Sequence, residues 1–252
     1  MGRFAKKLSC AVLLSLLGVQ ASAAMRFYTE EAAPLAFMQG GEMRGMSAEL
    51  VNALIARTGE PSTVEIVPWT RGYYLAQREP DTALFSTVRT PEREASFQWV
   101  GPILVGSSRF YSLKSNPIEV NSLQDAAASG PLALPKKWYS YESLQHMGLS
   151  NLYGVDSAKI MVRMLKRGRV NLIATQDLTL EQELATGGLV PADVRAHMSF
   201  MKSAYYIAFS PATSPAKVAL WQSALDDMRA DGSYEKIVHK WLPHVDVNTS
   251  AE

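Results

Sequence analysis

Residues 47–87 read SAELVNALIARTGEPSTVEIVPWTRGYYLAQREPDTALFST, and this stretch decides the fold class. It begins with a predicted helix, in which Ser47 is typical of an N-cap and Gly59 is typical of the residue that ends a helix. The apolar side chains that give this helix one buried face are Leu50, Val51, Leu54 and Ile55.

Strand-like runs alternate with helices through the same part of the chain. We expect strands at residues 26–29, 63–67 and 82–87 and a second helix at residues 70–78. This alternation predicts an α/β fold with a largely parallel sheet covered by helices. Ligands of such sheets bind near the carboxyl ends of the strands.

The alternation starts again after Pro102, which indicates a second unit. We expect extended chain at 103–113, strands at 131–134, 151–155, 170–175 and 204–210, and helices at 141–147, from Asp156 or Ser157 to Gly168, from Ser214-Pro215 to Gly232 and from Ser233 to Trp241, with an irregular segment around Gly187-Gly188. There is no repeat of fixed period and no Gly/Ser linker, so structured crossings should join the two units.

The first 23 residues have the three parts of a secretory signal peptide. Arg3, Lys6 and Lys7 precede an apolar run from Leu8 to Val19, and the segment ends in Ala21-Ser22-Ala23. The apolar run is too short for a membrane-spanning helix, which takes about 20 residues. We expect cleavage after Ala23 and export to the periplasm.

Composition narrows the function classes. At roughly 150 residues per domain, the 252 residues predict one large or two small domains. The net charge is +1, and loss of the signal would leave 22 Lys and Arg against 24 Asp and Glu, a net charge of −2. Such a balance disfavours a nucleic-acid partner. The single cysteine, Cys10, lies in the signal, so we expect an exported chain without a thiol, a disulfide or a lipid anchor.

Common catalytic and metal-binding signatures are missing from the sequence. There is no GxxxxGK[ST], GxGxxG or GxSxG motif, which disfavours nucleotide binding and α/β-hydrolase chemistry. The four histidines lack the paired spacing of a zinc site. We therefore expect no cofactor and no metal.

Three segments together resemble a known family. They are Gly45-Met46-Ser47-Ala48-Glu49-Leu50, the run Arg89-Thr90-Pro91-Glu92-Arg93 with Phe97 four positions on, and the ending, which reads AYYIAFS at 204–210 and MRADGSYEKIVHKW at 228–241. In these segments the chain is similar to the bacterial extracellular solute-binding proteins of family 3, the periplasmic polar-amino-acid binders.

The resemblance implies a type 2 periplasmic binding fold, in which two α/β lobes joined by two crossing strands close over a ligand cleft. The implied crossings fall near residues 106–111 and 203–208. The implied domains are residues 24–106 and 204–245 for lobe one, 107–203 for lobe two and 246–252 for a loose tail. It also implies a monomer without catalytic activity that delivers a small carboxylate-bearing solute to an inner-membrane ABC permease.

In lobe one, Arg93 matches the family arginine that binds the ligand carboxylate. A planar guanidinium suits this task because it can donate two parallel hydrogen bonds. Ser86 and Thr87 match positions that hydrogen-bond the ligand, although such hydroxyls also bond their own backbone. Trp69 lies within one position of an aromatic residue that stacks on the ligand, with core packing as its alternative role.

Two further arginines have open alternatives. Arg89 would add a second cation to the cleft or form a salt bridge to Glu92 or Glu94. Arg71, two residues after the candidate Trp69, is a similar case.

In lobe two, Trp138, Tyr139 and Ser140 follow a predicted strand. The resemblance places them at a turn where family members bind the carboxylate with a hydroxyl and with helix amides. A solvent-facing basic turn is the alternative.

The residues that would bind a ligand ammonium depart from the family pattern. Family members have an acidic residue where this chain has Gln176, and Asp177 follows one position later. A one-residue bulge would bring Asp177 into place, whereas regular strand alternation points it away. Near the N-terminus, Glu30 and Glu31 are candidate substitutes for a family aspartate. The carboxylate half of the site therefore matches the family better than the ammonium half.

Two other functions stay open at this point. Some proteins of this fold family are enzymes, such as periplasmic cyclohexadienyl dehydratases, in which a cleft carboxylate acts as an acid or a base; Glu30, Glu31 or Asp177 would be that group. The third reading is a sensor that presents its ligand to a membrane receptor.

Overall fold

The computed structural model describes residues 24–243 and residue 245. The expected signal peptide at residues 1–23 and the expected tail at 246–252 lie outside this range. Over the described range, no helix combines the length and the apolar character needed to cross a bilayer.

The strands of the described chain form one large sheet and one hairpin. The sheet has the order β4-β1-β5-β10-β6-β9-β7-β8. Its strands are β1 (Met25–Thr29), β4 (Ser62–Ile66), β5 (Thr82–Val88), β6 (Gln98–Leu113), β7 (Leu132–Pro135), β8 (Leu152–Val155), β9 (Leu172–Gln176) and β10 (Val194–Phe209). The hairpin consists of β2 (Phe37–Gln39) and β3 (Glu42–Arg44).

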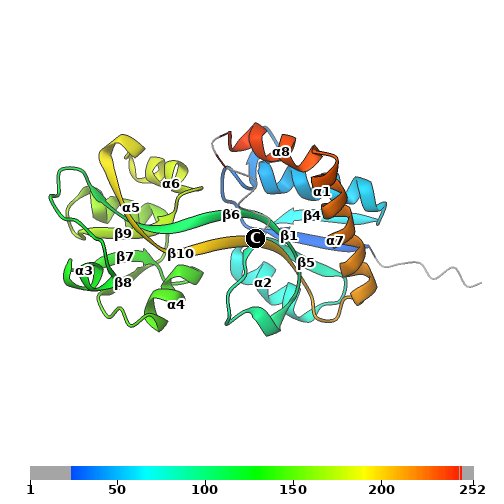
Figure 1. The fold of residues 1–252 in the computed structure, drawn as a ribbon, viewed down its shortest axis with the longest axis horizontal. Coiled ribbons are helices and arrows are strands. Elements are labelled where there is room, and N and C mark those ends of the chain that lie inside the picture. The colour runs from blue at the N-terminus through cyan, green and yellow to red at the C-terminus, as the bar shows by residue number, and fades with distance from the viewer. Residues whose placement is uncertain (1–23, 244, 246–252) are drawn as a thin grey trace, which may run out of the picture.

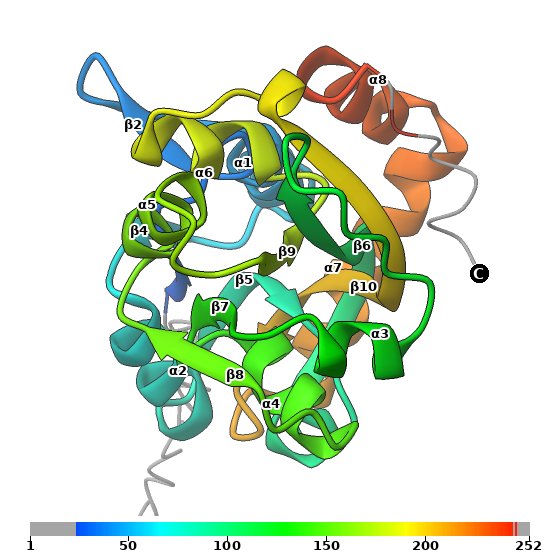
Figure 2. The ribbon, with the colours of Figure 1, turned by 90° about the vertical axis from the view of Figure 1, so that its left-hand side faces the viewer.

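Helices cover both parts of this sheet. They are α1 (Met46–Thr58), α2 (Trp69–Arg78), α3 (Leu123–Ala128), α4 (Tyr139–His146), α5 (Ala158–Lys166), α6 (Leu180–Gly187), α7 (Pro215–Ala230) and α8 (Ser233–Trp241). Figure 1 shows two groups of elements: lobe one with β1 to β5, α1, α2, α7 and α8, and lobe two with α3 to α6 and β7 to β9. In the end-on view of Figure 2, α5 and α6 lie on one side of the lobe-two strands and α3 and α4 on the other.

Two long strands join the lobes. β6 and β10, 16 residues each, run antiparallel to one another through both lobes. Within the large sheet, the pairs that do not involve them, β1–β4, β1–β5, β7–β8 and β7–β9, are parallel. The expected α/β class with two crossing strands is therefore confirmed.

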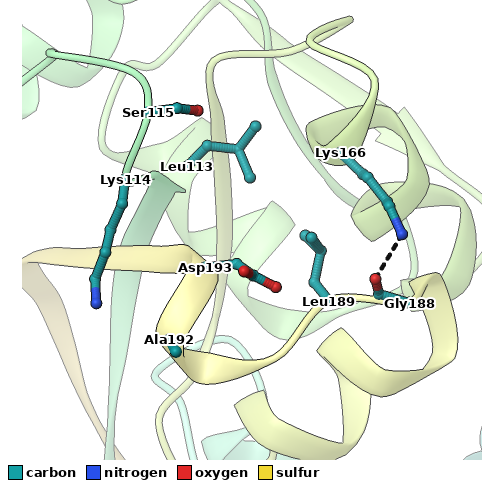
Figure 3. Close-up of a pocket in the computed structure, with 8 residues that line it drawn as sticks. All are labelled: Leu113, Lys114, Ser115, Lys166, Gly188, Leu189, Ala192 and Asp193. Atoms are coloured by element: carbon teal, nitrogen blue, oxygen red, sulfur yellow. Dashed lines mark hydrogen bonds between the residues drawn. The ribbon is translucent and has the colours of Figure 1, made fainter.

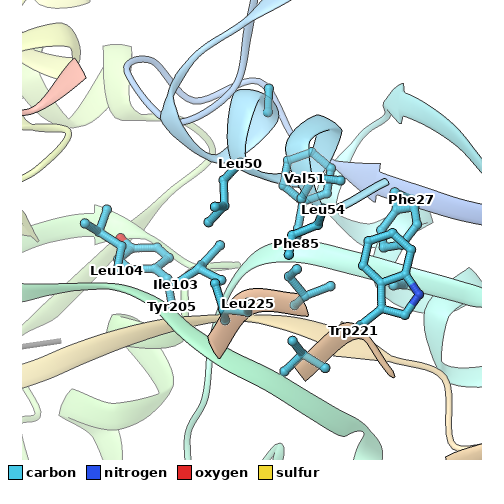
Figure 4. Close-up of a cluster of buried hydrophobic side chains, with 14 of the residues drawn as sticks. Phe27, Leu50, Val51, Leu54, Phe85, Ile103, Leu104, Tyr205, Trp221 and Leu225 are labelled. Carbon is cyan, nitrogen blue, oxygen red and sulfur yellow. The ribbon is translucent and has the colours of Figure 1, made fainter. Parts of the chain in front are cut away.

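Each lobe has its own hydrophobic core. The first core cluster, drawn in Figure 4, takes its buried residues from the segments 25–104 and 205–238 and contains the fully buried Phe27, Phe85 and Trp221. The second takes its buried residues from 110–194. Full burial of such a side chain stabilises the fold by about 1.5–3 kcal/mol. A third, smaller cluster lies under α2, where Trp69 and Tyr73 pack against its edge.

Two helix starts differ from the sequence expectation. Gly45, not Ser47, is the N-cap of α1, and Gly232, not Ser233, is the N-cap of α8. Ser47 is instead buried in the first turn, where its backbone N–H donates to Leu35 O at 2.9 Å. Backbone carbonyls of the preceding loop thus replace the expected side-chain cap. At α5 the expected cap is present, because Ser157 Oγ accepts from Ile160 N.

Two segments are more regular than the sequence suggested. The expected irregular region before Gly188 contains α6, and Gly188 ends that helix in a left-handed conformation. β10 begins ten residues before the expected strand, at Val194. Register shifts near Ala196, Ser199 and Tyr205 interrupt its in–out alternation, so the pattern that identifies a strand is lost there.

Candidate functional site

A buried arginine lies at the boundary between the lobes. Arg93 follows β5 in lobe one and is 5% exposed. Its guanidinium carbon is 5.3 Å from the ring centre of Trp69, 5.5 Å from that of Tyr73 and 5.9 Å from that of Tyr139. Trp69 and Tyr73 belong to α2 of lobe one, whereas Tyr139 begins α4 of lobe two. We call Arg93, these three rings and Glu142 of α4 the interlobe site.

The guanidinium of Arg93 has few polar partners. Its Nη1 donates to Val88 O at 3.5 Å, and its Nη2 is 4.0 Å from Glu142 Oε2. The Glu142 side chain is 51% exposed, so water screens its attraction to Arg93. A guanidinium has five N–H donors. Arg93 can therefore offer a parallel pair of donors to a carboxylate.

Of the two hydroxyls at the end of β5, one has no partner and one is already bonded. Ser86 has a left-handed backbone with φ of 56°, and its buried Oγ has no hydrogen-bond partner in the described structure. Thr87 Oγ1 donates to Leu84 O at 2.9 Å. This is the bond to the local backbone that was the alternative to ligand binding for this hydroxyl. The pairing of β5 with β10 shifts between Tyr206 and Ala208, so Ser86 lies in a bulge.

The other two candidate arginines are exposed. Arg89 donates from Nε and Nη2 to the two carboxylate oxygens of Glu94 at 2.7 and 2.5 Å. Of its two alternatives, the salt bridge to Glu94 is thus present. Arg71 is exposed on α2.

The lobe-two candidates occupy different environments. The Tyr139 hydroxyl lies 2.9 Å from Ser108 Oγ of β6 and 3.1 Å from Ser203 Oγ of β10. Burial raises the pKa of Tyr139 to about 12, so the phenol is neutral at physiological pH. Ser140 is buried inside α4, and Trp138 packs against the second core cluster. Tyr139 is thus the one of the three that meets Arg93.

Gln176 and Asp177 face different groups. Gln176 is 6% exposed, its Nε2 donates to Ser108 Oγ at 2.9 Å, and its buried Oε1 has no partner among the described residues. Asp177 is exposed, and its Oδ1 accepts from Ser107 N at 2.9 Å. The β6–β9 pairing is regular up to Gln176, without the bulge that would exchange the two side chains.

Glu30 lies on the lobe-one side of the same region. It directly follows β1 and is half-buried, whereas Glu31 is exposed. Burial raises the pKa of Glu30 to about 7, and the positive charge of Arg93 only partly opposes this rise. Glu30 can therefore exchange a proton near neutral pH.

The sequence did not single out Glu183, Glu142 or Tyr73. Glu183 lies in the first turn of α6, accepts hydrogen bonds from Thr175 Oγ1 and Thr179 Oγ1, and has a pKa that burial raises to about 7. It was missed because α6 was expected to be irregular. Tyr73 carried a usable signal, since it lies four residues after Trp69 on the same helix.

A separate pocket lies in lobe two and holds none of the predicted residues. Its volume is about 500 Å³, and Figure 3 shows the residues that line it. Lys166 Nζ donates to Gly188 O at 2.6 Å at its rim. Its lining residues are Leu113, Lys114, Ser115, Lys166, Gly188, Leu189, Ala192 and Asp193.

Two α/β lobes on paired crossing strands, with a buried arginine between them, define a two-lobed binding protein. A model of the bacterial extracellular solute-binding proteins, family 3, matches residues 25–244, and the chain belongs to this family. No curated protein matches the chain at a significant level.

Solved structures of three kinds share the fold. The arginine-, lysine- and histidine-binding protein ArtJ from Geobacillus stearothermophilus has a TM-score of 0.76 and 15% identity over 91% of this chain and 100% of that one. A histidine kinase sensor domain has a TM-score of 0.77 and 17% identity over 87% and 96% of the two chains. An ancestral amino-acid-binding protein, a precursor of cyclohexadienyl dehydratase, has a TM-score of 0.72 and 18% identity over 86% and 95%. These low identities establish the fold alone.

Proposed function

We propose that this chain is a periplasmic solute-binding protein of an ABC importer, which binds a small carboxylate-bearing solute between its lobes without changing it chemically. The observation that supports this most is Arg93: a buried cation with spare donors, ringed by aromatic side chains of both lobes. Family membership supports solute binding, and the signal-like residues 1–23 support export.

The interlobe site has the chemistry that such a solute needs. A bidentate pair with Arg93 would supply charged hydrogen bonds, which contribute about 1.5–3 kcal/mol each. The rings of Trp69, Tyr73 and Tyr139 would exclude water from that pair and give an organic ligand apolar contact. Micromolar binding requires only about −8 kcal/mol.

A thermal-shift screen of amino acids, dicarboxylates and aromatic acids tests this function. We expect the unfolding temperature to rise with one class of carboxylate, and Arg93→Ala to abolish that rise while the variant keeps the wild-type circular dichroism spectrum. Arg78→Ala is the matched control, because Arg78 lies on the exposed end of the same lobe's α2. Equal affinity of Arg93→Ala and wild type would refute the assignment.

One observation favours an enzyme as the second candidate. Glu30 lies near Arg93 with a pKa of about 7, where a carboxyl group can act as an acid or a base. One structural relative is a precursor of a dehydratase. Incubating the identified solute with the protein and separating the products by chromatography distinguishes the two functions, since a binding protein returns its solute unchanged.

A sensor role would use the same binding chemistry. The observation that supports this alternative is that a histidine kinase sensor domain shares the fold. Reconstitution with the permease encoded nearest to it, followed by a transport measurement, separates the two roles.

A further inference from the structure

Positive charge gathers on α5 of lobe two and on the turn that follows this helix. Residues 157–176 contain no Asp or Glu, so the segment has a net charge of +5, whereas the chain from residue 24 onward has a net charge of −2. All five cations are exposed. They are Lys159, Arg163, Lys166, Arg167 and Arg169.

The first four of these cations share one face of the helix. At about 100° per residue, positions 159, 163, 166 and 167 fall within an arc of about 100°. The other side of α5 carries Met161, Val162 and Leu165, which are buried in the second core cluster. In Figure 2, α5 lies beside α6 on one side of the lobe-two strands. The cationic side of α5 therefore faces away from the core of lobe two.

The protein does not neutralise these cations itself. In the described part of lobe two, ion pairs are formed by other cations and by none of these five. Lys166 Nζ donates only to a backbone oxygen, that of Gly188. Asp156, the acid that precedes the segment, already lies 3.0 Å from Lys136 Nζ through its Oδ1. The positive charge is thus available to a partner.

Apolar side chains are exposed next to the cations. Ile160 is 43% exposed, Tyr153 of the edge strand β8 is 53% exposed, and Met164 is half-buried. Ile160 and Met164 lie four residues apart, so they are neighbours on α5. With Arg169, these three side chains line a surface hollow of about 530 Å³. We call the five cations and these three apolar side chains the α5 face.

We propose that the α5 face is a docking surface for the anionic phospholipid headgroups of a membrane. The cations attract the headgroups, and the apolar side chains pack at the boundary between headgroups and acyl chains. Such binding is reversible, because each cation adds only a modest factor to the affinity. The docking concentrates an exported protein at the membrane, whichever solute it binds.

The freedom of the cationic side chains favours lipid over an acidic polypeptide as the occupant. Apart from Lys166, the described structure shows no hydrogen bond or ion pair that fixes one of them. A rigid array of carboxylates would have to order each of these long side chains, and that ordering opposes binding. Phospholipid headgroups diffuse laterally to meet the cations. A membrane also gives Ile160 and Tyr153 an apolar contact, which an acidic segment lacks.

Co-sedimentation with lipid vesicles tests the proposal. The protein used begins at Ala24, because residues 1–23 contain cations and an apolar run of their own, and both hydrophobic cores lie after them. One set of vesicles consists of phosphatidylcholine, and the other also contains the anionic phosphatidylglycerol. At low ionic strength we expect at least about tenfold tighter binding to the anionic vesicles. High salt should abolish that difference.

Paired substitutions assign the binding to the α5 face. Lys159→Gln combined with Arg163→Gln should weaken binding to anionic vesicles about tenfold or more. The matched control combines Lys236→Gln with Arg78→Gln, which removes one lysine and one arginine from exposed helix positions of lobe one. This control should bind the vesicles like wild type.

A second pair of variants tests the apolar contact. Ile160→Ser should weaken binding to anionic vesicles several-fold, whereas Leu220→Ser should not, although Leu220 of α7 is 41% exposed. Circular dichroism checks that each variant is folded. Where the paired substitution at 159 and 163 fails to fold, Arg167→Gln combined with Arg169→Gln replaces it, with the same expected loss.

Three outcomes would overturn the proposal. The first is equal binding to anionic and neutral vesicles. The second is a folded α5-face double variant that binds like wild type, or a lobe-one control that loses as much affinity. The third is tighter binding to poly-L-glutamate than to anionic vesicles with no effect of Ile160→Ser, which identifies an acidic polypeptide as the occupant. The substituted residues lie outside the interlobe site, so the proposed function is tested separately.

Discussion

Arg93 is a buried cation surrounded by three aromatic rings, and its ion-pair partner Glu142 lies 4.0 Å away. A ring face stabilises a nearby cation by about 0.5–2 kcal/mol, depending on how far water is excluded. The rings of Trp69, Tyr73 and Tyr139 can therefore hold the guanidinium in place without using up its hydrogen-bond donors. A close carboxylate would have fixed it more strongly and would have competed with the ligand. This arrangement explains how Arg93 can be buried while its hydrogen-bond donors stay available to a ligand.

Ser86 shows that the chain accepts local backbone strain in β5, the strand that precedes this arginine. A non-glycine residue in the left-handed region is destabilising by about 1 kcal/mol, and glycine is free of that penalty. We predict that Ser86→Gly raises the free energy of unfolding by up to about 1 kcal/mol and weakens solute binding, because the orphan Oγ is lost. Urea unfolding and calorimetry measure the two effects. A variant that is more stable and binds equally well would show that this hydroxyl has no role in binding.

Glu183 gives the stability of the unliganded protein a pH dependence. Its pKa is raised from the ordinary 4.5 to about 7 in the folded protein, so folding is progressively disfavoured as pH rises from 4.5 to 7 and the loss is complete above 7. Glutamine cannot ionise and avoids this loss. We predict that, at pH 8, Glu183→Gln has a free energy of unfolding about 1–3 kcal/mol larger than that of wild type and unfolds at a higher temperature. At pH 4.5 the two proteins should unfold at nearly the same temperature.

Glu181→Gln serves as the control for this pH series. Glu181 is exposed on the same helix, so its removal should leave the stability difference small at both pH values. A Glu183→Gln variant less stable than wild type at pH 8 would mean that the ionised carboxylate with its two threonine bonds stabilises the fold.

At the scale of elements, the start of α1 depends on a glycine. Gly45 has φ of 116°, and a Cβ there would lie 2.4 Å from Leu35 O, a backbone atom that also accepts from the first turn of α1. We predict that Gly45→Ala lowers the free energy of unfolding by about 2–4 kcal/mol. Gly59→Ala, at the other end of the helix, has φ of 67° and open space around its Cβ, so it should lose only about 1 kcal/mol. Chemical unfolding of both variants tests the difference, and equal losses would contradict it.

The sequence predicts an element well when residues near it in the chain determine that element. The apolar face of α1 and the caps of α5 and α7 are determined by residues within one or two turns, and periodicity identified those helices. The cap of α1 is different, because its acceptor is supplied by the loop at Leu35 and only the folded chain brings it there. β10 was underestimated for a related reason: its polar first half is stabilised by pairing with β6, a partner far away in sequence.

The same distinction applies to the candidate site: the sequence indicated single residues, but it did not indicate contacts between distant parts of the chain. Arg93 and Tyr139 could be named because the chain resembles a known family at these positions, and each follows a strand end where ligands of α/β folds bind. Their meeting across the lobes depends on the crossing of β6 and β10 and has no local signal. Asp177 shows the reverse case. A carboxylate close to the expected position is bound to Ser107 N of the crossing strand, and sequence spacing cannot reveal such an anchor.

At the scale of the whole molecule, weak polar contacts join the lobes beside the site. His146 Nδ1 lies 3.3 Å from Glu92 Oε1, and Arg93 Nη2 lies 4.0 Å from Glu142 Oε2. Apart from Arg93, these side chains are well exposed, and exposed ion pairs contribute about 0–1 kcal/mol. Such contacts cannot hold the lobes together by themselves. A ligand that binds both lobes would therefore set the balance between open and closed forms.

Cross-linking across the lobes tests this coupling. Cys10 is the only cysteine of the chain and precedes the expected cleavage site, so a protein carrying Glu92→Cys and His146→Cys presents two thiols, one from each lobe. We predict that the solute found in the thermal-shift screen speeds the bridging of these thiols by a short bifunctional reagent several-fold, because it favours the form in which positions 92 and 146 are in contact. Adding Arg93→Ala to the same protein should remove the acceleration while leaving the basal rate. Equal rates with and without a solute that demonstrably binds would show that binding does not bring the lobes together.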